Sequence, residues 1–202
     1  MKKLTIIIAI MAIAGGAYFV LGRGGKGATP TALPAPSIDG GVLKLIDARA
    51  SSRDFSAREI DDKTLSEILW AAFGKNSRGT RTIPTSRGRQ ALAVYAITKN
   101  GAFLYDGAGL VKKSGDDLRP LFAHTMQSFP KTAPLTILFA GDDAMNSPIH
   151  AGAAMQNVGL YAAEKGMGAV VRMMFDKDAA KKALAMPKAE QPIVSITIGW
   201  VK

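Results

Sequence analysis

Hydrophobic residues recur at helical spacing between residues 61 and 74. The acidic pair Asp61-Asp62 opens this stretch, and its apolar positions fall on one helical face: Leu65, Ile68, Leu69, Ala72 and Phe73. Residues three and four apart lie above one another on a helix, so this spacing predicts an amphipathic helix with a buried stripe. An aspartate at the start and Gly74 at the end are typical helix boundaries.

Short apolar runs elsewhere predict strands, at residues 92–98, 102–106, 135–140, 169–172 and 193–198. Asn100-Gly101 separates the first two runs, and an Asn-Gly pair between apolar runs favours a tight antiparallel hairpin. The run at 135–140 is apolar at nearly every position, which is typical of a strand buried on both faces.

Further helices are expected between these strands. One starts at Asp116-Asp117 and runs toward Thr125, and another spans residues 177–184 with Asp176 as its N-cap. The segment 148–165 is rich in alanine and glycine and apolar nearly all round, which predicts a buried helix. Residues 42–46 are apolar but too few to assign, and the arginine-rich stretch 75–90 is interpreted as a loop. The pattern predicts an α+β fold with a mixed sheet flanked by helices.

The first 22 residues have the pattern of a targeting segment. Two lysines precede an apolar run from Leu4 to Leu21 that is about long enough to span a bilayer. We therefore expect a signal peptide or membrane anchor at 1–22, and an exported protein in the periplasm or anchored in the cell envelope. Gly15-Gly16-Ala17 is a candidate cleavage site, whereas the apolar residues that follow it favour an uncleaved anchor.

Residues 23–40 are dominated by glycine and proline and are interpreted as a linker before a folded domain at 41–202. Gly22, Gly24 and Gly27 match the spacing G-x-G-x-x-G. A dinucleotide-binding loop needs a strand before these glycines and a helix after them. Here an apolar targeting segment precedes them and prolines follow, so we reject this match.

Composition excludes several kinds of chemistry. The 202 residues contain no cysteine and two histidines, His124 and His150, which excludes disulfides, thiolate nucleophiles and histidine-rich metal sites. The motifs G-x-S-x-G and H-E-x-x-H are also absent from the sequence. Either histidine is more readily explained as a structural residue than as a catalytic one.

The chain carries a formal net charge of +10, which indicates an anionic partner, ligand or surface. Arg49, Ser51 and Arg53 alternate along one segment, so an extended backbone would place two guanidinium groups and a hydroxyl on one side. Such a set suits a phosphate group, although a solvated basic segment explains the same residues.

A second basic segment surrounds Pro84-Thr85-Ser86. It contains Arg78, Arg81, Arg87 and Arg89 and could be a nucleic-acid patch, an anion-binding loop or a plain soluble loop. Single-stranded nucleic acid is usually bound by aromatic residues interleaved with basic ones, and this segment has no such aromatics. We therefore expect no nucleic-acid partner.

An ordered set of motifs resembles the nitroreductase-like FMN flavoproteins, over about residues 42–200. The set is Arg49-x-Ser51-x-Arg53-x-Phe55, the helix from Leu65 to Gly74, Arg81-Thr82-x-Pro84-Thr85-Ser86, Val94-Tyr95, Gly101 to Asp106, Ala154-x-Gln156-Asn157, Gly166-Met167-Gly168, Phe175-Asp176 and Pro192 to Gly199. Each motif alone has low specificity, and their order carries the resemblance.

The resemblance implies FMN as cofactor, bound at the interface of a homodimer whose core contains helix 148–165. It assigns the FMN phosphate to the segment that contains Arg49, Ser51 and Arg53. It places the flavin ring beside two further groups of residues: Pro84, Thr85, Ser86, Gly88 and Gln90, and Val171, Arg172 and Met173. Many relatives have asparagine at the position of Gly88, and glycine lacks that side-chain hydrogen bond. Many also continue beyond the last strand, where this sequence stops at Lys202, so the intertwining of the subunits stays open.

The implied function is two-electron transfer through bound FMN to a small acceptor such as a quinone, a nitroaromatic or another flavin. The resemblance implies no dedicated acid–base residue, and either Arg172 or Arg87 is the candidate cation beside the flavin ring. The alternatives are a flavin-binding module without turnover and a membrane-anchored interaction module without a ligand.

Overall fold

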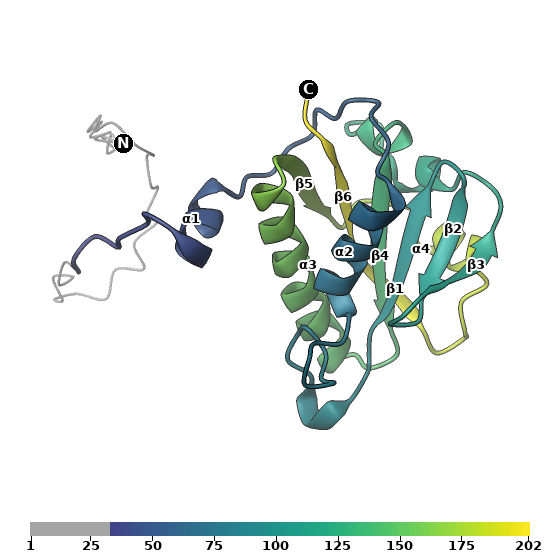
Figure 1. Cartoon of the computed structure of the whole chain (residues 1–202). Helices are drawn as coiled ribbons and strands as arrows, with labels where there is room; N and C mark the ends of the chain where they lie inside the picture. Colours follow the sequence, from purple (N-terminus) through teal and green to yellow (C-terminus); the bar gives the residue numbers. More distant parts are fainter. Residues whose placement is uncertain (1–32) are drawn as a thin grey trace, which may run out of the picture. The chain divides into compact units, whose positions relative to one another are not determined.

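Six strands form one sheet in the order β3-β2-β1-β4-β6-β5 (Figure 1). Their bounds are β1 Ala93–Thr98, β2 Gly101–Tyr105, β3 Leu110–Ser114, β4 Leu135–Gly141, β5 Met167–Arg172 and β6 Gln191–Trp200. This computed structural model describes residues 33–202. The predicted targeting segment 1–22 and most of the predicted linker lie outside the described residues, and within 33–202 no helix is both long and apolar enough to cross a membrane.

The expectation of a mixed sheet is wrong, because all five pairings between neighbouring strands are antiparallel. The Asn-Gly hairpin is confirmed, with Thr98 opposite Gly101 in β1 and β2. The helix-linked strands β4 and β5 do run in the same direction, as such connections favour. However, β6 lies between them and pairs antiparallel with both.

The helices are α1 Gly41–Ala48, α2 Asp62–Phe73, α3 Asn146–Glu164 and α4 Lys177–Ala183. The predicted boundaries of α2 are confirmed: the Asp61 side chain accepts a hydrogen bond from the Thr64 N–H at 2.7 Å, and the Gly74 N–H donates to Trp70 O at 2.8 Å. Asp176 caps α4 as predicted, accepting from the Ala179 N–H at 2.9 Å. The unassigned residues 42–46 belong to α1, none of whose residues is buried.

Two features of the central region differ from the expectation. The predicted helix from Asp116-Asp117 toward Thr125 is wrong, since only the 3-10 turn η2 Arg119–Phe122 forms there. Asp117 holds the Arg119 side chain at 2.7 Å just before Pro120, which fits a single tight turn. The second feature is β3, which was not predicted. Two further 3-10 turns are η1 Ser86–Gly88 and η3 Phe129–Lys131.

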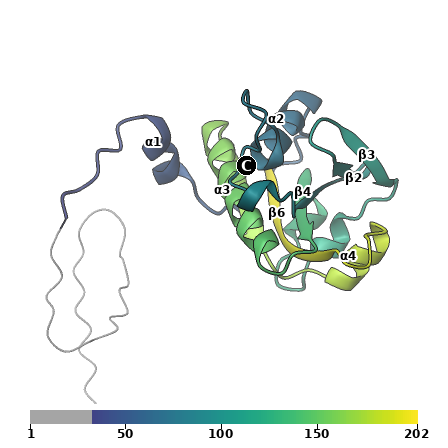
Figure 2. The same ribbon diagram turned by 90° about the horizontal axis from the view of Figure 1, so that it is seen from below.

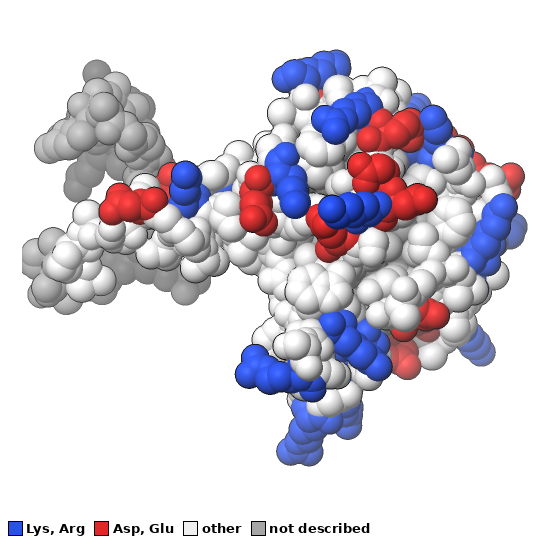
Figure 3. Space-filling view, viewed as in Figure 1, with Lys and Arg blue, Asp and Glu red and all other residues white. Residues whose placement is uncertain are grey.

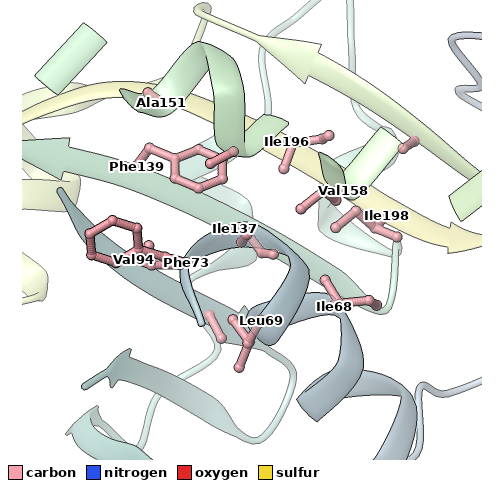
Figure 4. Close-up of a cluster of buried hydrophobic side chains, with 14 of the residues drawn as sticks. Ile68, Leu69, Phe73, Val94, Ile137, Phe139, Ala151, Val158, Ile196 and Ile198 are labelled. Atoms are coloured by element: carbon pink, nitrogen blue, oxygen red, sulfur yellow. The ribbon is translucent and has the colours of Figure 1, made fainter. Parts of the chain in front are cut away.

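Both faces of the sheet are covered. Helices α2 and α3 pack on one face, where the buried side chains include Ile68, Leu69, Phe73, Val94, Ile137, Phe139, Val158 and Ile196 (Figure 4). Tyr95, Ile97 and Leu138 point to the other face, where they pack with Phe122 of η2 and with Ala180 of α4. Figure 2 shows α4 at this face of the sheet. Because β4 is buried on both faces, its sequence is a continuous apolar run rather than an alternating one. This two-sided core fixes α3 and β5, the two elements that build the candidate site.

Candidate functional site

The segment that follows α1 is extended and runs along β5. Ser51 forms a parallel bridge with Ala169, and the Ser52 N–H donates to Ala169 O at 3.2 Å. Successive side chains therefore alternate between two sides: Arg49 and Ser51 line one cavity, while Ala50 and Ser52 line another. This alternation confirms the extended geometry inferred from the sequence for the first two members of the Arg49-Ser51-Arg53 set.

Arg49 and Ser51 share a cavity of about 180 Å³ with residues of α3, β5 and β6. The other lining residues are Gly152, Met155, Gln156, Gly159, Ala169, Val171 and Ile196. None of these described lining residues is acidic, so the Arg49 guanidinium supplies the formal charge at the cavity wall. A Cβ atom on Gly159 would lie 3.3 Å from Arg49 Cδ, so the arginine side chain passes close to the α3 backbone at this position.

Arg172 follows the cavity-lining Val171 in β5 and is a buried cation, with 4% of its surface exposed. Its guanidinium donates to Gln127 Oε1 at 2.8 Å, to Met174 O at 3.0 Å and to Phe122 O. Burial lowers the pKa of Arg172, and the nearby charge of Arg53 lowers it further. Its three acceptors are neutral, so two arginines add positive charge at this end of β5.

The predicted flavin-ring residues of the loop before β1 do not line this cavity. Pro84, Thr85, Ser86, Gly88 and Gln90 lie on the loop around η1, while Val171 lines the cavity and Met173 is exposed just beyond β5. Gly88 has φ +71°, a left-handed conformation that favours glycine. The Gln90 side chain accepts hydrogen bonds from the Arg81 guanidinium, so it does not project freely from the loop.

Basic side chains gather around this loop. Lys75, Arg78, Arg87 and Arg89 are exposed there, and Figure 3 shows Lys and Arg side chains gathered at the end of the domain where the loop lies in Figure 1. Arg89 pairs with Asp143 at 3.3 Å. Arg87 has φ +50°, which is unusual for a residue other than glycine, and no ion-pair partner among residues 33–202.

Several residues of α3 join the site without having been selected from the sequence. Met155, Gln156 and Gly159 line the cavity, and His150 contacts the η1 loop, where its Nε2 accepts from the Ser86 N–H at 3.4 Å. The motif Ala154-x-Gln156-Asn157 pointed to the cavity-lining part of α3, which contains Met155 and Gln156. Nothing local in the sequence pairs residue 150 with residue 86.

Asp143 anchors the start of α3, and its charge is expected to make stability depend on pH. Hydrogen bonds from the Asn146 N–H and side chain lower the pKa of Asp143 from 3.8 to about 2. The charged form is thus favoured in the folded state. The resulting stabilisation is complete above pH 3.8 and is lost as the pH falls through about 2.

We expect Asp143→Asn to weaken the dependence of stability on pH between about 2 and 5. Urea denaturation of both proteins across this range measures the effect. Asp142→Asn, which alters the neighbouring exposed carboxylate, is the matched control and should keep the native slope. An Asp143→Asn slope equal to that of the native chain would contradict the expectation.

Comparison with known proteins places this geometry in a family. The sequence model of the nitroreductase family matches residues 46–200. A proposed nitroreductase from Ralstonia eutropha JMP134 has 33% identity and a TM-score of 0.71, with 84% of this chain and 88% of that chain covered. No curated protein matches this chain.

Two more distant structures share the fold. A nitroreductase family protein from Clostridium difficile 630 has 21% identity and a TM-score of 0.58, over 81% of this chain and 85% of that one. An FMN-dependent nitroreductase from C. difficile R20291 has 20% identity and a TM-score of 0.59, over 79% of this chain and 87% of that one. The family match spans most of the chain and includes the segment, helix and strands that enclose the cavity, so the protein belongs to the nitroreductase family.

Proposed function

We propose that the protein is an FMN-dependent oxidoreductase that transfers two electrons through bound flavin to a small acceptor, namely a quinone, a nitroaromatic or another flavin. The nitroreductase family supports an oxidoreductase at the coarser level. The observation that carries the finer proposal is the cavity shared by Arg49 and Ser51, whose lining contains no acidic residue.

The side chains at this cavity fit the phosphate of a mononucleotide. A guanidinium and a hydroxyl face one space, and a second arginine, Arg53, follows two residues later on the exposed part of the same segment. Arginine presents paired donors that match phosphate oxygens, and its charge persists at all physiological pH values. When bound, FMN supplies the electron-transfer chemistry itself.

The remaining residues would bind and orient the cofactor. Val171 and Met173 expose apolar surface next to the cavity, where the flat ring of a flavin has apolar faces to cover. Arg172 is buried, with three of its five N–H donors bonded to protein acceptors, so its guanidinium is poorly accessible to a ligand. Of the two candidate cations for the flavin ring, Arg87 is therefore the one whose side chain is available to a ligand.

We propose that the active form is a homodimer. The exposed large apolar residues include Val42, Leu43 and Ile46 of α1 and Ile149 of α3. Such a set marks a contact surface more often than open solvent. Because the loop at Pro84–Ser86 lies outside the cavity of its own subunit, a second subunit is the natural source of that part of a flavin site.

We also propose that residues 1–22 target the protein to the cell envelope, as a cleaved signal peptide or as an anchor. The support is the sequence pattern alone, since these residues lie outside those described. In that location NADH and NADPH are not expected, so the electron donor would be a quinol or a membrane flavoprotein.

The proposal is tested with the full-length chain purified in detergent. We expect it to bind FMN in stoichiometric amount, and more tightly than riboflavin, which lacks the phosphate that Arg49 and Ser51 would contact. Anaerobic titration with a quinol analogue should bleach the flavin absorbance, and adding a quinone or a nitroaromatic should restore it. A protein that takes up no FMN would refute the proposal.

A flavin-binding module without turnover is the second candidate. Gly88 favours it, because this position offers no side chain to a flavin and Gln90 nearby is bonded to Arg81. The same titration separates the two candidates. FMN that binds but is neither reduced by quinol or NADH nor reoxidised by the acceptors would favour the binding module.

A further inference from the structure

Three side chains of α3 hold the backbone of the loop between α2 and β1. Asn157 Nδ2 donates to Thr82 O at 3.2 Å, and Ser147 Oγ donates to Ala91 O. Between these two ends, the Ser86 N–H donates to His150 Nε2 at 3.4 Å. The second half of the loop, from Thr82 to Ala91, is therefore held to one helix at both of its ends and near its middle.

Of these three residues, His150 has the most unusual hydrogen bonding. It is buried, with 2% of its surface exposed, and its Nε2 accepts a hydrogen bond, so the ring hydrogen lies on Nδ1. Nδ1 is the one buried side-chain nitrogen or oxygen without a hydrogen-bond partner among residues 33–202. A buried imidazole with an unsatisfied donor is unfavourable, so packing alone does not explain a histidine at this position.

The segment that His150 contacts has an unusual backbone. Arg87 and Gly88 follow Ser86 directly, and both have positive φ values, +50° and +71°. Arginine rarely adopts such a conformation unless the surrounding structure imposes it. Inside the turn the Arg89 N–H donates to Ser86 O at 2.9 Å, whereas the Gly88 N–H reaches Thr85 O only at 3.4 Å. Ser86 therefore takes part in the turn through its carbonyl and in the contact with His150 through its N–H.

We propose that His150 is a positioning residue: its unprotonated Nε2 fixes the Ser86 N–H and thereby holds Pro84–Gly88 in the conformation presented to the flavin ring. The presentation of the loop to a flavin ring rests on the proposed function, whereas the positioning of the loop by His150 does not. The imidazole acts through the loop and touches neither cofactor nor substrate.

The conformation of the loop can be followed by limited proteolysis, because trypsin cleaves after Arg87 and Arg89. In the flavin-free full-length protein, we expect His150→Leu to raise the cleavage rate after Arg87 about three- to tenfold. This is the range for one lost hydrogen bond when cleavage follows local opening. His150→Gln supplies an amide oxygen as acceptor and should restore most of the protection. His124→Leu, at the exposed histidine, is the matched control and should cleave at the native rate.

A second variant removes the other partner of the same hydrogen bond. Ser86→Pro deletes the N–H at the first position of the 3-10 turn, after Thr85, whose extended backbone (φ −126°, ψ 129°) suits a residue before proline. If the proposal is correct, the double variant with His150→Leu is cleaved no faster than the more sensitive single variant. Additive effects would overturn it, as would equal cleavage of His150→Leu and the native chain.

Circular dichroism and the cleavage rate after Lys112, in β3, identify a variant that fails to fold. If His150→Leu fails to fold, Ser86→Pro alone must show the accelerated cleavage after Arg87. Cleavage of Ser86→Pro at the native rate would then overturn the proposal. In the flavin-loaded protein, we expect His150→Leu to change the visible circular dichroism of bound FMN and His150→Gln to restore it. Loss of the proteolytic effect refutes the positioning role. Absence of FMN binding by the native chain refutes the proposed function and leaves the proteolysis result valid.

Discussion

Replacing Arg172 by alanine is expected to lower the free energy of unfolding by about 2–4 kcal/mol. The substitution leaves three acceptors without their donor: Phe122 O, Met174 O and Gln127 Oε1. It also opens a void under the Phe129 ring, whose centroid lies 5.1 Å from the guanidinium carbon. Hydrogen bonds to a charged group contribute more than neutral ones, and buried acceptors that lose a donor carry a desolvation penalty.

Urea denaturation of the two proteins measures this difference. Arg53→Ala is the matched control, since it removes an exposed arginine close to Arg172, and we expect a change within about 0.5 kcal/mol. Removing Arg53 also removes a like charge from beside Arg172, so a slight gain in stability is consistent with the argument. A loss below about 1 kcal/mol for Arg172→Ala would show that water replaces the missing donors.

Arg49→Ala is expected to weaken FMN binding by about 10- to 150-fold. This range corresponds to the loss of one hydrogen bond to a charged group, about 1.5–3 kcal/mol. Arg49 lines the cavity together with Ser51, and in the proposed site its guanidinium would contact the phosphate directly. Arg49→Lys keeps the charge without the paired donors and should bind FMN with intermediate affinity.

Flavin fluorescence titration at physiological salt measures these affinities, and circular dichroism confirms folding. Arg78→Ala is the control, because Arg78 is exposed on the basic loop and a solvated charge adds only a weak, salt-screened attraction. Equal losses for the two variants would place the phosphate elsewhere. They would also refute the assignment of residues 49–53 to the phosphate.

The sequence predicted elements whose signals are local. Asp61 and Gly74 bound α2, and the Asn-Gly pair forms the hairpin between β1 and β2. Strand β3 was missed because it lies at the sheet edge with its first three residues exposed, so burial imposes no apolar pattern on it. A mixed sheet was expected because local patterns do not reveal that β6 lies between β4 and β5.

In the site, too, local features were predicted from the sequence and contacts between distant segments were not. The alternation of Arg49 and Ser51 onto one cavity followed from their spacing, because an extended backbone has a fixed period of two. The contact between His150 and Ser86 spans 64 residues of sequence and could not be predicted from either neighbourhood. Likewise, the pairing of Gln90 with Arg81 depends on how the loop folds back, which residue types alone do not specify.

The segment that carries Arg49 and Ser51 has a second effect, on aggregation. A sheet edge with unpaired N–H and C=O groups is a template for strands of other molecules. One edge of this sheet is β3, whose Lys112 and Lys113 discourage such pairing by their charge. The other edge is β5, and the Ser51–Ala169 bridge together with the Ser52 N–H covers part of it. Residues 49–52 thus protect this edge from association with strands of other molecules. A substitution that alters ligand binding by detaching this segment would also expose unpaired backbone groups of β5.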